Sequence, residues 1–388
     1  MPYVPATTHP NGVRLLALDG GGVRGVVSLI ILDEIMKRIQ KRKGLKEPCR
    51  PADYFELAAG TSTGGIIGIM LFRLHMTAED TIKMYDVISK QVFSPKVYGY
   101  EISNFFGNKI GSLINNSKTI VQSSRFDDAS LKLAIDNVVE KFGLDDNDKK
   151  LKGEAPLFHE KASKMFLCTT AQNKAETVLM RSYELKNKEK AIAFTSSKVN
   201  NVMQNYQSKI TISLAARATS AAPTYFPEVE WPSKADRKAD ETPLIFWDGG
   251  LLNNNPIDQL WYSRYDLVAS DEPAPPVSCV ISLGTGFSRS GSPDNSWIRL
   301  AGVASSVMDF ATNTNAKGKD FSRHMKHLNT RPEYEKTEYL RFNPDLGANA
   351  VGLADYTKME FLKKITREDL ARPGSQDYIE RAVRALAP

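Results

Sequence analysis

The chain has 388 residues, of which 41% are hydrophobic and 25% are charged, and its formal net charge is +6. This balance is that of an ordinary globular protein, excludes a disordered chain and leaves enough apolar residues for a large core. The basic residues are scattered and do not interleave with aromatic residues, so we expect no nucleic-acid binding.

The cysteines, Cys49, Cys168 and Cys279, are odd in number and far apart. They indicate neither a disulfide framework nor a zinc motif, and they fit a reducing compartment. Residues 1–12 form a polar tail without the apolar core of a signal peptide, and no run of about 18 apolar residues predicts a transmembrane helix. We therefore expect a cytoplasmic protein or one peripheral to membranes, while a processed secreted form stays open.

Hydrophobic periodicity predicts strands and helices that alternate along most of the chain. The predicted strands are Val13–Leu18, Tyr54–Ala59, Lys164–Thr170, Val178–Tyr183, Pro243–Trp247, Ser278–Leu283 and Glu338–Phe342. The predicted helices are Val26–Gln40, Gly64–Leu74, Ala78–Val92 with Thr77 as its N-cap, Asp127–Phe142 and Ile210–Thr219, with mostly helix after about Asn295.

Two segments lack this periodicity. Phe93–Ser124 mixes aromatic residues with Gly, Asn and Ser, and we expect long loops or short helices near a binding face. Its part Phe93–Phe106 could serve as a lid or membrane contact, or as ordinary loop packing. The charged stretch Asp145–Gly153 predicts an exposed turn.

Alternating strands and helices predict an α/β fold, a three-layer α/β/α arrangement around a mostly parallel central sheet. The chemistry of such folds gathers at the carboxyl ends of the strands. Asp19, Gly60, Asp248 and Gly284 all follow or end a predicted strand. We therefore expect the functional site among these residues.

The segment Gly60-Thr61-Ser62-Thr63-Gly64 matches G-x-S-x-G between a predicted strand and a predicted helix. In hydrolases this context places Ser on a sharp, strained turn with an exposed hydroxyl. The flanking glycines avoid clashes with the neighbouring strand and helix. A glycine-rich helix start with Ser62 as its cap is the alternative interpretation.

A second glycine motif, Asp19 to Gly25, also joins a strand to a helix. It contains G-x-G-x-x-G, but no acidic residue ends the next strand as a dinucleotide site requires. Its glycines Gly20, Gly21, Gly22 and Gly25 suit an oxyanion hole, in which backbone N–H groups converge on one point. Arg24 could hold this loop or meet a phosphate or carboxylate of the substrate.

A nucleophilic serine needs a proton acceptor, usually a histidine. None of the histidines, His9, His75, His159, His324 and His327, follows a strand end, and the pair His324 and His327 lacks a third metal ligand. Asp248 does end a strand, before Gly249 and Gly250. Desolvation would raise its basicity, so a Ser62–Asp248 pair is plausible, although Asp248 could also be a turn former.

Taken together, these motifs resemble the patatin-like phospholipase family. The resemblance rests on an ordered set of segments, which are Asp19–Gly25, Gly60–Gly65, Ala218–Pro227, Asp248–Gly250 with Asn253–Pro256, and Ile281–Gly286. It implies a patatin-like fold, Ser62 and Asp248 as catalytic residues, and an oxyanion loop at Gly20, Gly21, Gly22, Arg24 and Gly25. It also implies Gly60, Thr61, Thr63 and Gly64 as the nucleophile elbow and Gly249 and Gly250 as the base motif.

The resemblance implies a hydrolase that cleaves fatty acyl esters of phospholipids or other lipids, without cofactor or metal. Its partner would be a lipid substrate, at a membrane or lipid surface, and oligomeric state stays open. We expect a catalytic domain over residues 13–290 and a mostly helical part over 291–388 that packs on the same domain. A soluble carboxylesterase or thioesterase, or a catalytically silent lipid-binding module, remain alternatives.

Overall fold

Short aliphatic runs form the central sheet of the computed structural model, which describes residues 12–94, 96–97, 100–101, 126–185, 209–268, 275–288, 314–332, 336–347 and 351–388. The strands of the main sheet are β1 (Val13–Leu18), β2 (Leu57–Thr61), β5 (Met165–Ala171), β6 (Glu176–Arg181), β7 (Val229–Trp231), β8 (Leu244–Asp248), β9 (Val277–Leu283) and β10 (Glu338–Phe342). Two short strands, β3 (Lys96–Val97) and β4 (Tyr100–Glu101), pair separately.

Within the described residues, the main sheet has eight strands in the order β10-β9-β1-β2-β5-β8-β7, and β6 also pairs with β5. The pairs from β10 to β5 are parallel, whereas β6, β8 and β7 run antiparallel to their neighbours. The expected mostly parallel sheet is therefore confirmed. Its antiparallel part includes the strand that ends at Asp248.

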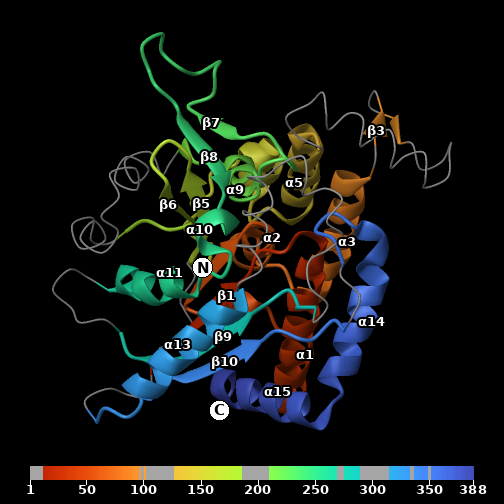
Figure 1. Ribbon diagram of the computed structural model, residues 1–388, viewed down its shortest axis with the longest axis vertical. Coiled ribbons are helices and arrows are strands. Elements are labelled where there is room, and N and C mark those ends of the chain that lie inside the picture. Colours follow the sequence, from red (N-terminus) through yellow and green to blue (C-terminus); the bar gives the residue numbers. More distant parts are fainter. Residues whose placement is uncertain are drawn as a thin grey trace.

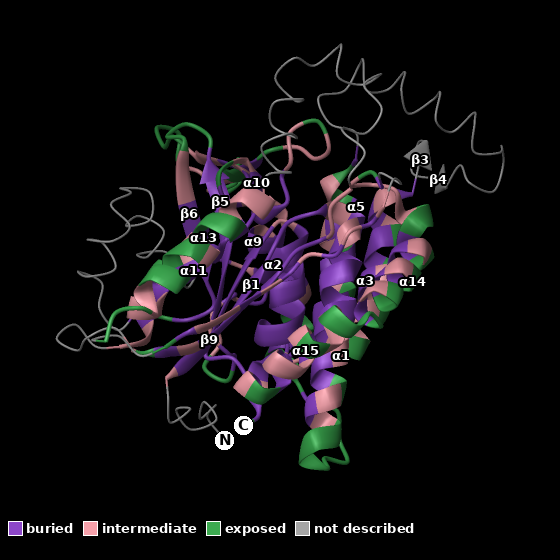
Figure 2. Ribbon diagram, turned by 60° about the horizontal axis from the view of Figure 1, so that its bottom comes forward, coloured by how far each residue is buried: buried purple, intermediate pink, exposed green. Residues whose placement is uncertain are grey.

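Helices cover both faces of the sheet (Figures 1 and 2). They are α1 (Gly25–Lys43), α2 (Thr63–Gly68), α3 (Ala78–Phe93), α5 (Asp128–Phe142), α6 (Asp146–Leu151), α9 (Ile212–Thr219), α10 (Gly250–Asn253), α11 (Ile257–Ser263), α13 (Thr314–Leu328), α14 (Met359–Leu370) and α15 (Pro373–Leu386). Figure 2 shows the buried strands with α11 and α13 on one side and α1, α3 and α14 on the other. The expected three-layer architecture is confirmed.

The side chains of β1 alternate between two cores because successive residues of a strand point to opposite faces. Leu16 and Leu18 pack in the larger core with the α1 side of the molecule. Leu15 and Ala17 pack in the smaller core, which also holds Leu260 of α11. Burial on both faces explains why β1 is a continuous apolar run.

Helix ends follow the expected chemistry in several places. Thr77 caps α3 by accepting a hydrogen bond from the Asp80 N–H. Helix α1 ends at Gly44, whose φ of 61° is the left-handed conformation that glycine adopts readily. The apolar helix after Ser62 changes at Ile69 from α-helix to a π-helical turn, Ile69–Arg73.

The strand predicted from Tyr54 begins only at Leu57, because Pro51–Asp53 forms a 3₁₀ turn before it.

The stretch Asp145–Gly153 is mostly exposed, as predicted, but the predicted turn is wrong because the stretch forms a short helix and a 3₁₀ turn. Asp145 caps helix α6, and the next turn, Lys152–Glu154, is 3₁₀. Asp148 is buried because both of its oxygens accept hydrogen bonds from Arg73, each at 2.7 Å. Asp148 departs from the exposure of its neighbours because a buried arginine neutralises its carboxylate.

The C-terminal residues pack against the first helix of the chain. Helix α14 runs beside α1, α15 crosses near the end of α1, and β10 extends the sheet beside β9 (Figure 1). The boundary at residues 290 and 291 stays a prediction. Most of the aromatic segment Phe93–Phe106 lies outside the described residues, as does the tail 1–11.

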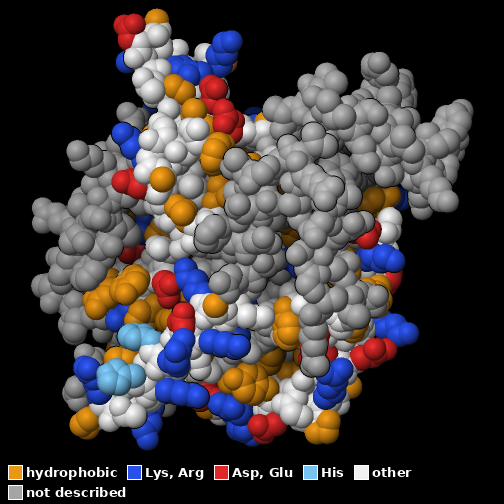
Figure 3. Space-filling model, in the orientation of Figure 1, with side chains coloured by type: hydrophobic (Ala, Val, Ile, Leu, Met, Phe, Trp, Pro, Cys, Tyr) orange, Lys and Arg blue, Asp and Glu red, His pale blue; other side chains and the backbone are white. Residues whose placement is uncertain are grey.

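The described part of the face shown in Figure 3 carries charges of both signs. In the view of Figure 3, Lys and Arg side chains lie among Asp and Glu side chains over the described surface. None of the helices in the described part of the chain is long and apolar enough to span a bilayer.

Candidate active site

Ser62 lies on the sharp turn between β2 and α2. Its φ is 55°, a conformation that is strained for a residue with a side chain. Gly60 and Gly64 make this turn possible, because a Cβ on Gly60 would lie 2.3 Å from the Gly64 oxygen, and one on Gly64 would lie 2.3 Å from the Leu18 oxygen. The predicted strand–turn–helix context is present. Ser62 itself is partly exposed.

The Ser62 hydroxyl donates a hydrogen bond to Oδ2 of Asp248 at 2.7 Å. The register of β5 explains how these distant residues meet. Thr61 pairs with Cys168 in the parallel ladder, and the next residue, Thr169, pairs with Asp248 in the antiparallel ladder. Ser62 and Asp248 therefore flank the same level of β5.

This arrangement corrects one part of the sequence argument. We expected Asp248 at the same sheet edge as Asp19 and Gly60 because all would end parallel strands. Strand β8 is antiparallel to β5 and ends partway along it, opposite Thr169. The carboxylate of Asp248 still reaches the turn after Thr61, although β8 runs in the direction opposite to β2 and β5.

Asp248 is buried, with 7% of its surface exposed. Burial raises the pKa of its carboxyl to about 6, although hydrogen bonds from the Gly250 N–H and the Ser62 hydroxyl lower it. The Gly250 N–H reaches Oδ1 at 2.6 Å. Gly249 cannot carry a side chain here, because a Cβ would lie 2.1 Å from the Cys168 oxygen. Both glycines of the predicted base motif thus shape the carboxylate's surroundings.

The glycine loop after Asp19 adjoins Ser62, because a Cβ on Gly20 would lie 3.1 Å from the Ser62 Cβ. Its N–H groups differ in their partners. Gly20 donates to the Asn254 oxygen at 3.0 Å, and Gly21 donates to Thr63 Oγ1 at 3.2 Å. Within the described residues, the Gly22 N–H has no acceptor.

The carbonyl groups of the same loop are held by the surrounding scaffold. Thr285 Oγ1 donates to the Gly20 oxygen at 3.2 Å. The buried hydroxyl of Tyr85, from α3, donates to the Gly22 oxygen at 2.6 Å. Since a peptide group fixes its C=O and N–H in opposite directions, contacts on the carbonyls set where the loop N–H groups point.

Arg24 stands at the end of this loop, and its Nε lies 3.4 Å from the Gly21 oxygen. No carboxylate in the described part of the chain pairs with it. Burial lowers the pKa of this guanidinium, while nearby Tyr225 raises it. Gly25 opens α1, where a Cβ would lie 2.6 Å from the Tyr85 hydroxyl. The geometry leaves both interpretations of Arg24, as loop support and as an anion contact, in place.

The described histidines make their contacts away from Ser62. His75 contacts Ser163, His159 contacts Asp145, and His327 contacts Arg331. The ring of His324 packs against Trp261. His9 lies outside the described residues.

Among the residues that the structure describes, one cluster has the residue types of a metal site, namely Asp145, Asp148 and His159. Both oxygens of Asp148 are already bound by Arg73, as described above, so the residues do not fit a cation well. The cluster lies in the α6 region and contributes no group to the turn at Ser62.

A model of the patatin-like phospholipase family matches residues 16–261, which is more than half of the chain. The chain belongs to this family. Patatin-like protein 1 of Arabidopsis thaliana is 24% identical over 96% of this chain and 84% of its own length. The cGAMP-activated phospholipase of Vibrio cholerae is 26% identical over 74% of this chain and 67% of its own length. The calcium-independent phospholipase A2-gamma of Mus musculus is 26% identical over 92% of this chain and 39% of its own length.

In this patatin-like chain, Thr219 is a structural partner of the serine turn that sequence reasoning did not single out. Its buried hydroxyl donates to the Cys168 oxygen at 2.6 Å and accepts from the Ser62 N–H at 2.9 Å. The segment Ala218–Pro227 also supplies the Ala221 oxygen that accepts the Asp248 N–H. The motif resemblance had marked this segment, but not which of its atoms would matter.

Proposed function

We propose that this protein is a lipid acyl hydrolase of the phospholipase A or lysophospholipase type, with Ser62 as nucleophile and Asp248 as general base. The observation that carries the proposal is the 2.7 Å hydrogen bond from the Ser62 hydroxyl to a buried carboxylate. Membership of the patatin-like phospholipase family supports a lipid substrate, presented at a membrane or lipid surface. No cofactor or metal takes part in the proposed mechanism.

In the first step, Asp248 takes the Ser62 proton while the Ser62 oxygen attacks the ester carbonyl carbon. The carbonyl π electrons move to oxygen and form an oxyanion. The C–O bond to the leaving alcohol or lysolipid then breaks, and Asp248 returns the proton to that oxygen. The products are an acyl-serine at Ser62 and the free alcohol.

In the second step, Asp248 takes a proton from water as the water oxygen attacks the acyl-serine carbonyl. A second tetrahedral intermediate collapses, the fatty acid leaves, and Ser62 recovers its proton from Asp248. A carboxyl with a pKa of about 6 is ionised at pH 7 to 8, yet it is more basic than an ordinary aspartate. With this pKa, Asp248 can both accept a proton from Ser62 or water and return it to the leaving oxygen.

We propose that the oxyanion is held by N–H groups of the glycine loop, principally Gly22 and Gly21. Gly22 has no acceptor among the described residues, and the Gly21 N–H makes only a 3.2 Å bond to Thr63. The Gly20 N–H is already engaged by Asn254 and is the weaker candidate. Donors of this kind contribute about 3 kcal/mol each to the stability of the transition state.

Arg24 is the proposed contact for an anionic group of the substrate, such as a phosphodiester. It stands at the end of the glycine loop without a carboxylate partner in the described part of the chain. A partly buried guanidinium is stabilised by a bidentate anion, because partial burial disfavours its unpaired charge.

Replacement of either catalytic side chain tests the proposal. We expect Ser62→Ala to abolish labelling by a fluorophosphonate probe, and both Ser62→Ala and Asp248→Asn to lower ester hydrolysis by about 10³-fold or more. The matched control is Ser89→Ala, a buried serine in α3, which should retain labelling and turnover. Full activity in either catalytic variant would contradict the assignment.

The substrate class is tested by comparing phospholipid vesicles with short soluble esters and thioesters. Preferential release of fatty acid from vesicles supports a lipid acyl hydrolase. A clear preference for short monomeric substrates favours the soluble esterase or thioesterase. A wild-type protein that binds vesicles but neither hydrolyses esters nor reacts with the probe would be a catalytically silent module.

A further inference from the structure

A buried ion pair connects the last strand of the sheet to the start of the glycine loop. Arg341 of β10 donates from Nη1 to Asp19 Oδ1 at 2.9 Å and from Nη2 to Asp19 Oδ2 at 2.5 Å. The same Nη1 donates to Ser282 of β9 at 2.8 Å. The Asp19 side chain is fully buried. Arg341 lies beyond the part of the chain that the family model matches, residues 16–261.

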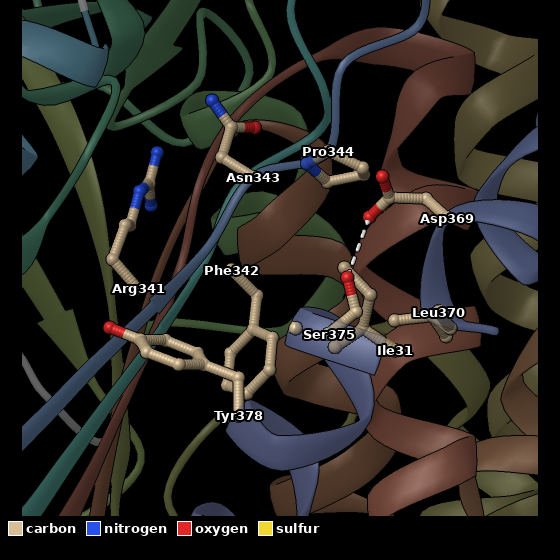
Figure 4. Close-up of a pocket in the computed structure, with 10 residues that line it drawn as sticks. Ile31, Arg341, Phe342, Asn343, Pro344, Asp369, Leu370, Ser375 and Tyr378 are labelled. Atoms are coloured by element: carbon tan, nitrogen blue, oxygen red, sulfur yellow. Dashed lines mark hydrogen bonds between the residues drawn. The ribbon is translucent and has the colours of Figure 1, made fainter. Parts of the chain in front are cut away.

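Arg341 binds Asp19 although another acidic side chain, Asp369, lines the same pocket. Figure 4 shows Arg341 at one side of a pocket whose other side holds Asp369 and Leu370. Asp369 accepts hydrogen bonds from Arg372 at 2.9 Å and from Ser375 at 3.4 Å. Arg341 instead directs both terminal nitrogens to the carboxylate that precedes the glycines.

Asp19 has a special place because three consecutive glycines follow it. Glycine has the greatest backbone freedom, and it offers no side chain through which a fold could fix the loop. Asp19 is therefore the last side chain that can anchor the loop from its strand side. Its N–H continues the β1–β9 ladder by donating to the Leu283 oxygen at 3.0 Å.

The C-terminal residues also hold the other end of the loop. The Val23 N–H donates to the Leu353 oxygen at 2.8 Å. A Cβ on Gly22 would lie 2.0 Å from that oxygen, so the two segments are in close contact. Both ends of the glycine loop thus depend on residues after β9.

We propose that Arg341 is a positioning residue for the hydrolase reaction. Its hydrogen bonds to both oxygens of Asp19 fix the position of the glycine loop, whose N–H groups bind the oxyanion. This inference rests on the proposed function. Arg341 also neutralises a carboxylate that would otherwise oppose the negative charge developing beside the loop. The planar fork of arginine can hold both oxygens at once, which a lysine ammonium cannot do with the same geometry.

The test is Arg341→Lys, assayed on a short soluble ester with active sites counted by a fluorophosphonate burst. We expect kcat per titrated site to fall about tenfold to a hundredfold, since small displacements of oriented groups cost this much. KM should change by less than about threefold, because the loop acts on the transition state more than on ground-state binding.

The matched control is Arg73→Lys, which alters another buried arginine bound to both oxygens of an aspartate, Asp148. This control should lower thermal stability and leave kcat per titrated site within about twofold of wild type. A purely structural role for Arg341 would give the same result in Arg341→Lys, with fewer titratable sites but unchanged kcat per site. That outcome overturns the inference.

If Arg341→Lys does not fold, the double variant Asp19→Asn with Arg341→Gln removes both buried charges and leaves a neutral amide pair. We expect it to fold with kcat per titrated site still reduced at least about tenfold. Wild-type kcat in this folded variant overturns the inference. A wild-type protein that neither reacts with the probe nor hydrolyses esters would overturn the proposed function itself, which the Arg341 variants alone cannot do.

Discussion

Asp248 combines a buried position with polar contacts that favour its charge. Burial raises the pKa of the carboxyl to about 6, against the lowering effect of hydrogen bonds from Gly250 and Ser62. A lone aspartate in water, with a pKa near 3.9, is a poor base. The fold thus gives a carboxylate part of the basicity that a histidine would have, without a histidine at the turn.

The pH dependence of kcat/KM follows from this pKa. In the proposed mechanism only ionised Asp248 can take the Ser62 proton, so we expect activity above the pKa and its loss as pH falls through about 6. We expect kcat/KM for a soluble ester at pH 5 to be about one tenth of its plateau. Circular dichroism over the same pH range controls for unfolding, and a flat profile down to pH 4 would contradict the role of Asp248.

Some site residues were predictable from sequence and others were not. Ser62 and Asp248 lie in short motifs beside apolar strands, so local sequence marks them. Thr219 and Arg341 contact the site from distant segments, and no spacing or periodicity marks a contact of that kind. Asn254 lies in the motif segment Asn253–Pro256. It is the backbone oxygen of Asn254 that accepts the Gly20 N–H, and the residue type of a position does not predict a backbone contact.

At the scale of elements, the turn between β2 and α2 depends on the absence of two side chains. Gly60 and Gly64 let the strand and helix approach closely enough for Ser62 to adopt its strained backbone. The strain is imposed by packing on both sides. The strained backbone of Ser62 is therefore maintained only while the elements around it stay folded.

Substitution of Gly60 tests this dependence. We expect Gly60→Ala to destabilise the protein by about 3 kcal/mol and to lose fluorophosphonate labelling, because the new Cβ would collide with the Gly64 backbone. Thermal unfolding and probe labelling measure the two effects. Gly374→Ala is the control, since a Cβ there meets nothing within 4 Å and should leave stability within about 0.5 kcal/mol. A fully labelled, wild-type-stable Gly60→Ala would disprove the steric argument.

Most elements were predictable because their apolar patterns are strong, and the misses have physical causes. Strand β1 was predicted with its observed bounds, Val13–Leu18. The direction of β8 was not, because it depends on long connections and not on the residues of the strand. Helix α6 was missed because its charged residues gave no apolar period, and only the distant Arg73 explains the burial of Asp148.

At the scale of the molecule, the C-terminal helices share the larger core with the first helix. Leu362 of α14 and Ile379 of α15 are fully buried in the cluster that contains Ile31 and Ile35 of α1. Strand β10 adds hydrogen bonds to β9 in the same sheet. We therefore expect residues 13–290 and 291–388 to unfold together.

Leu362→Ala tests this cooperativity. We expect a loss of about 2–5 kcal/mol in the free energy of unfolding, because the substitution leaves a cavity between α14 and α1. Loss of helical circular dichroism and loss of probe labelling should occur in one urea transition. The control is Leu45→Ala, at a side chain that is 44% exposed, and we expect it to leave the urea midpoint of unfolding unchanged. Two separate transitions would show that the C-terminal part is an independent unit.

The position of β1 in the sheet bears on how a newly made chain comes to be active. This early strand lies between β2 and β9, and the loop that follows it is held by Arg341, near the other end of the sequence. Contacts between such distant segments form late in folding. During synthesis the ribosome would thus release Ser62 and Asp248 long before the groups that complete their surroundings. In a nascent chain the glycine loop would therefore lack its contact with Arg341 until strand β10 had joined the sheet.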